Sequence, residues 1–146
     1  MSLLEVADLT VRFGRSRAVA VDGISFALGA TDRLGIIGQS GSGKSVTALA
    51  VMGLLPEHAE VTGSIRFDGV ELVGMPERDR RALRGDRISM VFQEPMTSIN
   101  PVLRIGDQIM EPLLLHRRMK RREAREEAAE LLQKVGIPAS RQRLAD

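Results

Sequence analysis

The sequence predicts an α/β protein, and three observations support this prediction. A short apolar run, residues 33–37, leads directly into a glycine-rich segment and then into an apolar helix, as in a layered α/β core. Alternating strands near the N-terminus and an Asp68-Gly69 turn between two apolar segments indicate an attached antiparallel sheet. From about residue 97 onward the apolar spacing becomes helical, which predicts the start of a helical subdomain.

Length and composition suit one soluble domain and argue against several functions. The 146 residues are 43% hydrophobic and 27% charged, so a core can form. A net charge of +2 and 3% aromatic residues give no indication of nucleic-acid binding. We expect no membrane helix, because the longest uncharged apolar stretch, residues 46–56, is far shorter than the ~20 residues needed. The N-terminus does not read as a secretion signal, and without cysteine there are no disulfides or thiol chemistry.

Three strands are expected before the glycine-rich segment. Residues 3–13 alternate in two pieces, and the break at Ala7-Asp8 predicts a bulge or a short turn. The next strand carries Ile24, Phe26 and Leu28 on one face. Residues 33–37 are uniformly apolar enough to predict a buried strand.

Further elements follow the glycine-rich segment. Residues 46–55 predict a helix that is apolar nearly all round and therefore buried, weakened at Gly53 and ended by Pro56. The hairpin at Asp68-Gly69 comes next, and a short charged helix begins at Pro76 and ends near residue 85. Residues 88–92 predict another apolar strand.

The C-terminal part is expected to be irregular over residues 94–101 and helical afterwards. Ile105, Ile109 and Leu113 share one helical face, with a kink or break at Pro112. A last helix is expected over about residues 120–135, and no further element in the ten residues after Gly136.

The glycine-rich segment matches the phosphate-binding pattern G-x-x-x-x-G-K-[ST] at every fixed position. Glycines allow the backbone N–H groups to wrap around a polyphosphate, and the following helix directs its positive end at the same anion. A lysine then reaches the β- and γ-phosphates, and a hydroxyl coordinates Mg²⁺. The alternative is a flexible Gly/Ser-rich turn that happens to hold a lysine. The matching residues are Gly38, Gln39, Ser40, Gly41, Ser42, Gly43, Lys44 and Ser45.

Several motifs follow one another as in the nucleotide-binding domains of ABC transporters, which the sequence resembles over essentially all of its length. The loop GQSGSGKS is followed by a hairpin SIRFDGVEL and by ISMVFQEP, in which Gln93 matches the Q-loop glutamine. The continuation QEPMTSINPVLRIGDQIMEPL resembles the branch that imports dipeptides and oligopeptides, with nickel transporters as near relatives. The resemblance implies a P-loop NTPase (RecA-like) core, an antiparallel β subdomain and the start of a helical subdomain.

The resemblance also implies roles for individual residues. Residues 38–45 would hold the phosphates of ATP, with Lys44 catalytic and Ser45 on Mg²⁺. Gln93 would contact Mg²⁺ or the attacking water and sense the membrane partner, unless it is simply a polar residue at a strand end. Phe13 matches the aromatic residue that stacks on adenine, although tyrosine is commoner there and Phe13 could equally be core.

Two other features are interpreted as structural. The basic run of residues 117–122 is followed directly by several glutamates, so pairs such as Arg122 with Glu126 would stabilise a solvated helix face. His58 and His116 have no neighbouring ligand at metal-binding spacing, and neither receives a role.

Motifs that the family carries later in its sequence do not occur here. The LSGGQ signature, the Walker B aspartate with its catalytic glutamate and the switch histidine are all missing. We therefore expect an incomplete core: residues 1–96 as the front of the ATP-binding core plus the β subdomain, and residues 97–146 as the start of the helical subdomain. The parent protein would hydrolyse ATP, whereas this chain alone would be inactive and marginally stable.

The resemblance implies partners and a location as well. Transmembrane permease subunits, a second nucleotide-binding domain and a solute-binding protein acting through the permease would be partners, at the cytoplasmic face of the inner membrane. Two alternatives stay open: an ABC-type ATPase outside transport, and a non-catalytic nucleotide-binding module. The transported solute does not follow from the sequence.

Overall fold

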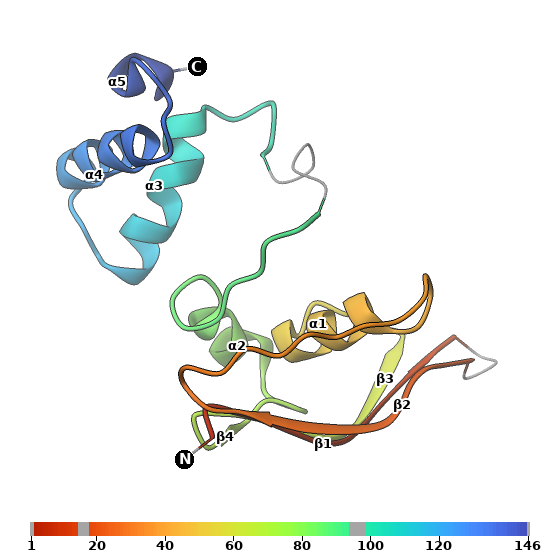
Figure 1. Cartoon of the computed structure of the whole chain (residues 1–146). Helices are drawn as coiled ribbons and strands as arrows, with labels where there is room; N and C mark the ends of the chain where they lie inside the picture. Colours follow the sequence, from red (N-terminus) through yellow and green to blue (C-terminus); the bar gives the residue numbers. More distant parts are fainter. Residues whose placement is uncertain (1, 15–17, 94–98, 146) are drawn as a thin grey trace. The chain divides into compact units, whose positions relative to one another are not determined.

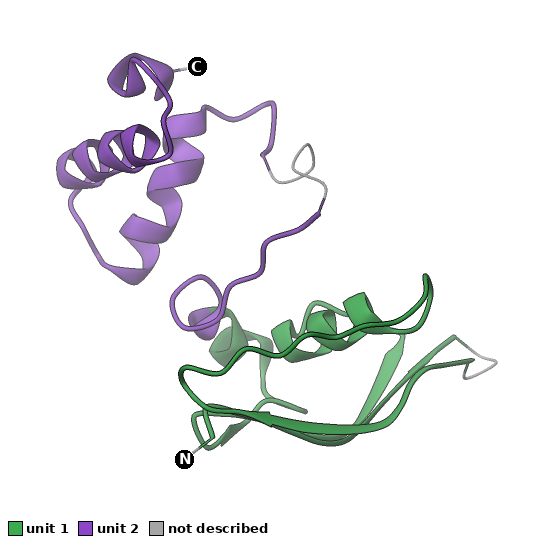
Figure 2. Ribbon diagram, in the orientation of Figure 1, with its two compact units in different colours: residues 1–81 green, residues 82–146 purple. Residues whose placement is uncertain are grey.

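The structure is a computed structural model that describes residues 2–14, 18–93 and 99–145. It divides into two compact units, Met1–Arg81 and Ala82–Asp146, which Figure 2 colours separately and which are described one at a time here. Of the expected irregular segment at residues 94–101, residues 99–101 have no helix or strand assignment, and residues 94–98 lie outside the described residues. The expected domain boundary between residues 96 and 97 falls there too and stays a prediction.

The first unit is built on a four-stranded antiparallel sheet in the order β2-β1-β3-β4. Its strands are β1 (Leu4–Phe13), β2 (Ala18–Leu28), β3 (Ala59–Phe67) and β4 (Val70–Glu71). This arrangement confirms the predicted antiparallel sheet and both N-terminal strands. The sheet is held by a buried set of branched side chains, namely Val6, Leu9, Val11, Val21, Ile65 and Leu72.

The predicted irregularity at Ala7-Asp8 is a bulge. Asp8 has a φ of 49°, and the pairing of β1 with β2 shifts register between Val6 and Leu9. On the opposite strand Gly63 has a φ of 96°, and a Cβ there would lie 2.5 Å from the carbonyl oxygen of Asp8. Glycine is therefore required at position 63, because the bulged backbone occupies the space of a side chain.

The hairpin between β3 and β4 turns at the predicted Asp68-Gly69 pair. Both residues adopt positive φ angles, 50° and 78°, as the two central residues of a type I′ turn do. The twist of such a turn matches the twist of the flanking strands, which explains why this dipeptide predicted the hairpin.

Helix α1 (Lys44–Met52) lies along one face of this sheet in Figure 1. It ends at Gly53, whose φ of 62° is left-handed and whose N–H donates to the carbonyl of Ala50 at 3.0 Å. The expected end at Pro56 was therefore too late. The expectation of burial all round was also wrong, since only Thr47, Ala50 and Met52 are buried. A helix that covers one face of one sheet buries one stripe.

Helix α2 (Glu77–Leu83) confirms the short charged helix, although it begins one residue after Pro76, the predicted first residue, and ends two residues before position 85. The Arg80 guanidinium donates a hydrogen bond to the carbonyl of Leu72, so this helix is tied back to the segment after β4.

Two expected strands do not form strands. Residues 33–37 and 88–92 have no strand assignment, and the second segment has a single isolated parallel bridge between Arg84 and Ile88. A parallel strand is stable only when neighbours satisfy its backbone N–H and C=O groups on both sides. Within residues 2–14, 18–93 and 99–145 no strand pairs with either segment. As a result Ile37 and Val91 are 97% and 96% exposed.

The second unit is helical, with α3 (Ile105–His116), α4 (Arg121–Lys134) and α5 (Ser140–Arg143). The first two agree with the predicted helices, and Pro112 lies inside α3. The short α5 contradicts the expectation of no element after Gly136. It forms because Leu144 directly after it is buried in the helical core. That core consists of Met110, Leu113, Ala124, Ala128, Ala129, Leu132 and Leu144.

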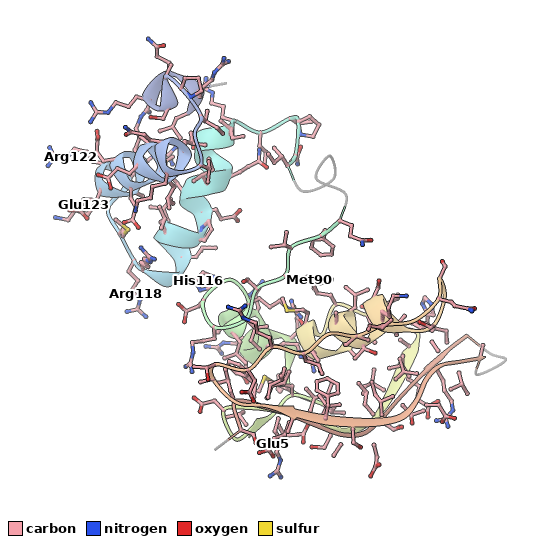
Figure 3. The ribbon with its side chains drawn as sticks, viewed as in Figure 1. Glu5, Met90, His116, Arg118, Arg122 and Glu123 are labelled. Atoms are coloured by element: carbon pink, nitrogen blue, oxygen red, sulfur yellow. The ribbon has the colours of Figure 1, made fainter. Side chains whose placement is uncertain are left out.

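The basic run lies at the surface of this unit and pairs across helices. Arg117 pairs with Glu127, and Arg121 contacts Asp107 at 2.6 Å. Glu126 pairs with Arg141 at 2.6 Å rather than with the expected Arg122. Figure 3 shows Arg118, Arg122 and Glu123 among the exposed side chains, in agreement with a solvated face.

No helix among the described residues combines the length and the hydropathy that crossing a bilayer requires.

Candidate nucleotide-binding site

Residues 38–43 form a loop between the apolar segment of residues 33–37 and α1, whose first two residues are Lys44 and Ser45. Two glycines make close approaches. A Cβ at Gly38 would lie 2.4 Å from Ser42 Oγ, so that hydroxyl would have to move, and a Cβ at Gly43 would lie 2.4 Å from the backbone oxygen of Ala20. Gly43 also has a φ of 89°, which strains any other residue. The glycines therefore let the loop close on itself and approach β2 directly.

The N-terminus of α1 offers free backbone donors. The first intrahelical bond runs from the Thr47 N–H to the Gly43 carbonyl at 2.8 Å, and the Thr47 hydroxyl donates to the same oxygen at 3.0 Å. The N–H groups of residues 44–46 thus precede the helical ladder, and no side chain caps the helix. Uncapped N–H groups and the positive end of the helix dipole favour an anion at this point.

The Lys44 ammonium lies inside the loop. Its Nζ donates to the carbonyl oxygens of Gly38 at 2.8 Å and Gln39 at 2.7 Å, and approaches Ser42 Oγ at 3.4 Å. The positive charge is therefore held against the same loop that leads into the helix end. These acceptors are neutral, so an anionic oxygen would compete well for the ammonium.

Ser45 occupies the first turn of α1 and is exposed, so its hydroxyl can be reached from solvent. One hydroxyl does not hold Mg²⁺, which prefers six oxygens and is usually bound together with substrate phosphates. A triphosphate in the loop would supply such oxygens next to Ser45, so the residues present fit a shared metal site. Gln39, Ser40 and Ser42 are likewise exposed.

The other two predicted residues lie outside the loop, one before it and one after it in the sequence. Phe13 is the last residue of β1, where it pairs with Ala18 of β2 and Ala59 of β3, and it is half-buried. Val11, two residues before Phe13 on the same strand, pairs with Val21. A Cβ built at Gly43, just before α1, would lie 3.2 Å from Val21 Cγ2. Gln93 is exposed and belongs to the other unit.

The structure adds one residue that sequence reasoning left without a role. The imidazole of His58 contacts the ring of Phe13, with ring centroids 6.1 Å apart and planes tilted by 59°. No spacing rule could have predicted this pair, because antiparallel pairing of β1 with β3 brings the two positions together.

A glycine-rich loop that delivers a lysine and a hydroxyl to the N-terminus of a helix defines the class of P-loop nucleotide-binding proteins. The chain belongs to the ABC transporter family: the family described as ABC transporter matches residues 21–146. The resemblance to nucleotide-binding domains of this family is thereby confirmed.

Curated relatives make the comparison more specific. The chain is 48% identical over 144 residues to the oligopeptide transport ATP-binding protein OppD of Salmonella typhimurium, covering 97% of this chain and 43% of the relative. It is 45% identical over 145 residues to the oligopeptide transport ATP-binding protein AppD of Bacillus subtilis, covering 97% and 44%. A peptidoglycan transport ATP-binding protein, YejF of Agrobacterium fabrum, is 48% identical over 146 residues, covering 97% and 27%. The chain thus spans less than half the length of these relatives.

Proposed function

We propose that this chain is the ATP-binding part of a peptide-importing ABC ATPase, and that residues 38–45 hold the triphosphate of ATP. The observation that carries the proposal is the convergence on one loop of two kinds of donor: the uncapped backbone N–H groups at the start of α1 and the Lys44 ammonium. Both are complementary to a dense anion.

Each residue then has a defined task. Lys44 exchanges its bonds to the Gly38 and Gln39 carbonyls for oxygens of the β- and γ-phosphates. Ser45 would hold Mg²⁺ through its hydroxyl together with the phosphates, and the ion would supply positive charge at that point. Phe13 offers its ring to adenine, and Gln93 orients the attacking water or contacts Mg²⁺. The last two roles rest on resemblance to the family.

The partners and the location are part of the same proposal. The relatives are named as ATP-binding proteins of oligopeptide transport, which supports association with permease subunits. A second nucleotide-binding domain and a solute-binding protein acting through the permease complete the assembly, at the cytoplasmic face of the inner membrane. ATP hydrolysis by the whole protein would be coupled to import.

The proposal is tested by binding of Mg·ATP to the intact protein and to its Lys44→Ala variant. Removing a charge-assisted contact to phosphate costs about 1.5–3 kcal/mol, so affinity should fall about 10- to 100-fold. Lys134→Ala removes a lysine from the last turn of α4, in the other unit, and should leave affinity unchanged. Equal affinity of the Lys44 variant and the wild-type protein would refute the proposal.

An alternative is a module that binds ATP without turnover. Single-turnover hydrolysis measured beside equilibrium binding separates the two functions. Capture of a membrane permease by the intact protein separates a transporter subunit from an ABC-type ATPase outside transport.

A further inference from the structure

The Phe13–His58 pair joins two strand ends of the first unit. Phe13 closes β1, His58 directly precedes β3, and Phe13 pairs with Ala59 in the sheet. The rings lie 6.1 Å apart at a tilt of 59°, within the range of favourable aromatic contacts. Phe13 is half-buried and His58 is exposed, so the pair forms part of the surface of the unit.

This surface is connected to the phosphate loop through the same sheet. A Cβ built at Gly43, just before α1, would be 3.2 Å from Val21 Cγ2, so the helix begins directly over Val21. Val21 pairs with Val11, and Phe13 ends the same strand two residues farther on, after a register shift between Val11 and Arg12. Two residues of strand span about 6–7 Å. Phe13 and the start of α1 are thus connected through the paired strands β1 and β2 of one sheet.

We infer that His58 is a positioning residue for the nucleotide base: its ring holds the Phe13 ring in the orientation that receives the base. This rests on the proposed function of Phe13 as the adenine contact. A tilted contact restrains the orientation of the phenyl ring and leaves its face open. A parallel stack would cover that face. Restraint before binding lowers the entropy cost of ordering that ring around the ligand, which raises affinity for the base and not for the phosphates.

The test compares Mg·ATP with Mg·tripolyphosphate, which has the phosphates but no base, on the intact protein. His58→Ala should weaken Mg·ATP binding about two- to tenfold and leave tripolyphosphate binding unchanged. His58→Phe keeps a ring and should retain ATP affinity. His116→Ala removes the other histidine, in the helical unit, and should change neither ligand.

The double variant Phe13→Ala/His58→Ala gives a second readout. If His58 acts through Phe13, the double variant should bind ATP no more weakly than Phe13→Ala alone. An unchanged ATP affinity of His58→Ala overturns the inference, as does an equal loss for ATP and tripolyphosphate, which would indicate a general disturbance of the site. Failure of the wild-type protein to bind either ligand overturns the proposed function itself and the inference with it.

Discussion

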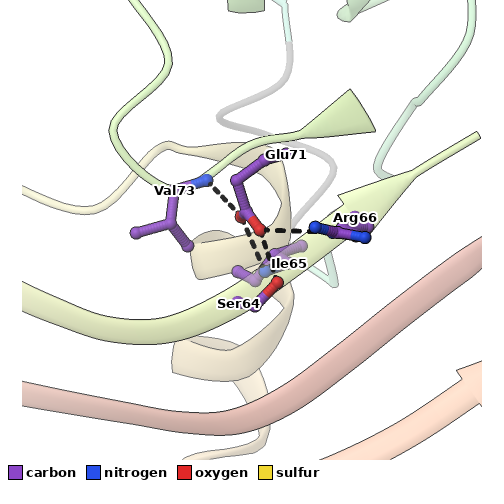
Figure 4. Close-up of polar contacts among 5 residues, drawn as sticks. All are labelled: Ser64, Ile65, Arg66, Glu71 and Val73. Carbon is purple, nitrogen blue, oxygen red and sulfur yellow. Dashed lines mark hydrogen bonds and ion pairs between the residues drawn. The ribbon is translucent and has the colours of Figure 1, made fainter. Parts of the chain in front are cut away.

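The Glu71 carboxylate connects four neighbours at the β3–β4 hairpin (Figure 4). It accepts hydrogen bonds from the Ser64 hydroxyl and from the backbone N–H groups of Ile65 and Val73, both at 2.9 Å. The fourth neighbour is the charged residue Arg66, whose Nε lies 3.8 Å from Oε2 of Glu71. A carboxylate with this many donors replaces backbone pairing that the two-residue strand β4 is too short to provide.

These contacts make stability depend on pH. Burial alone raises the pKa of the Glu71 carboxyl, but the hydrogen bonds from Ser64, Val73 and Ile65 and the charge of Arg66 outweigh it and lower the pKa below its ordinary 4.5. A carboxyl with a depressed pKa in the folded state stabilises the fold above the unfolded-state pKa. That stability is lost as the pH falls through the folded-state value.

Glu71→Gln should therefore lower the free energy of unfolding by about 1 kcal/mol at neutral pH, a modest figure because the side chain is 38% exposed. The difference from the wild-type protein should shrink as the pH falls through the lowered pKa of Glu71, where its carboxyl becomes protonated. Urea unfolding at several pH values measures both effects. Glu57→Gln, an exposed carboxylate of the same unit, serves as control. A difference independent of pH would contradict the assigned cause.

At the scale of elements, α3 and α4 pack through small and branched side chains. Ala124 and Ala128 are fully buried, which lets the two helices approach closely, and Met110, Leu113 and Leu132 fill the remaining space. Two adjacent positions on α4 differ sharply in exposure: Leu131 is 38% exposed whereas Leu132 is 6% exposed. One turn of a single helix thus contains a core leucine and a surface leucine.

Leu132→Ala should destabilise the helical unit by about 2–5 kcal/mol, because it removes buried methyl groups and leaves a cavity. Leu131→Ala is the matched control, with identical chemistry on the same helix, and should cost under about 1 kcal/mol. Hydrogen exchange of the α3 and α4 amides in the intact protein reports the difference locally. Equal protection losses in the two variants would show that the helices do not pack as described.

At the scale of the whole molecule, the two unpaired apolar segments are the dominant feature. Residues 33–37 and 88–92 have strand-like composition, but their backbone groups find no ladder within the described residues. Exposed segments with apolar side chains and unpaired backbone groups pair readily with other strands, including those of other copies of the same chain. This supports the expectation that the 146 residues alone are marginally stable.

A polypeptide of these 146 residues should therefore associate in a concentration-dependent manner and bind a dye specific for exposed apolar surface. Ile37→Lys together with Val91→Lys should reduce both effects, since charge on a strand edge opposes pairing. Val102→Lys alters another highly exposed valine outside these two segments and should have little effect. Light scattering and dye fluorescence measure the result. A stable monomer with a cooperative thermal transition would contradict the prediction.

Local signals predicted much of the fold. The phosphate loop stands out in the sequence because its fixed positions, Gly38, Gly43, Lys44 and Ser45, match a short pattern with a chemical reason for each residue type. Likewise the bulge at Ala7-Asp8 and the turn at Asp68-Gly69 depend on backbone angles that few residues adopt. The helices over residues 105–116 and 121–134 could be predicted because a repeating apolar face is a property of adjacent turns.

Long-range pairing was decided only by the tertiary structure. Whether residues 33–37 form a strand depends on partners elsewhere, and apolar composition does not reveal whether they are present. The same holds for Glu126, which pairs with Arg141 across helices, for the short helix that Leu144 anchors, and for His58 beside Phe13. Sequence by itself determined this protein's phosphate-loop pattern and its local turns and helices, because those arise from neighbouring residues. Contacts between distant residues required the folded chain, because they depend on how separate elements pack.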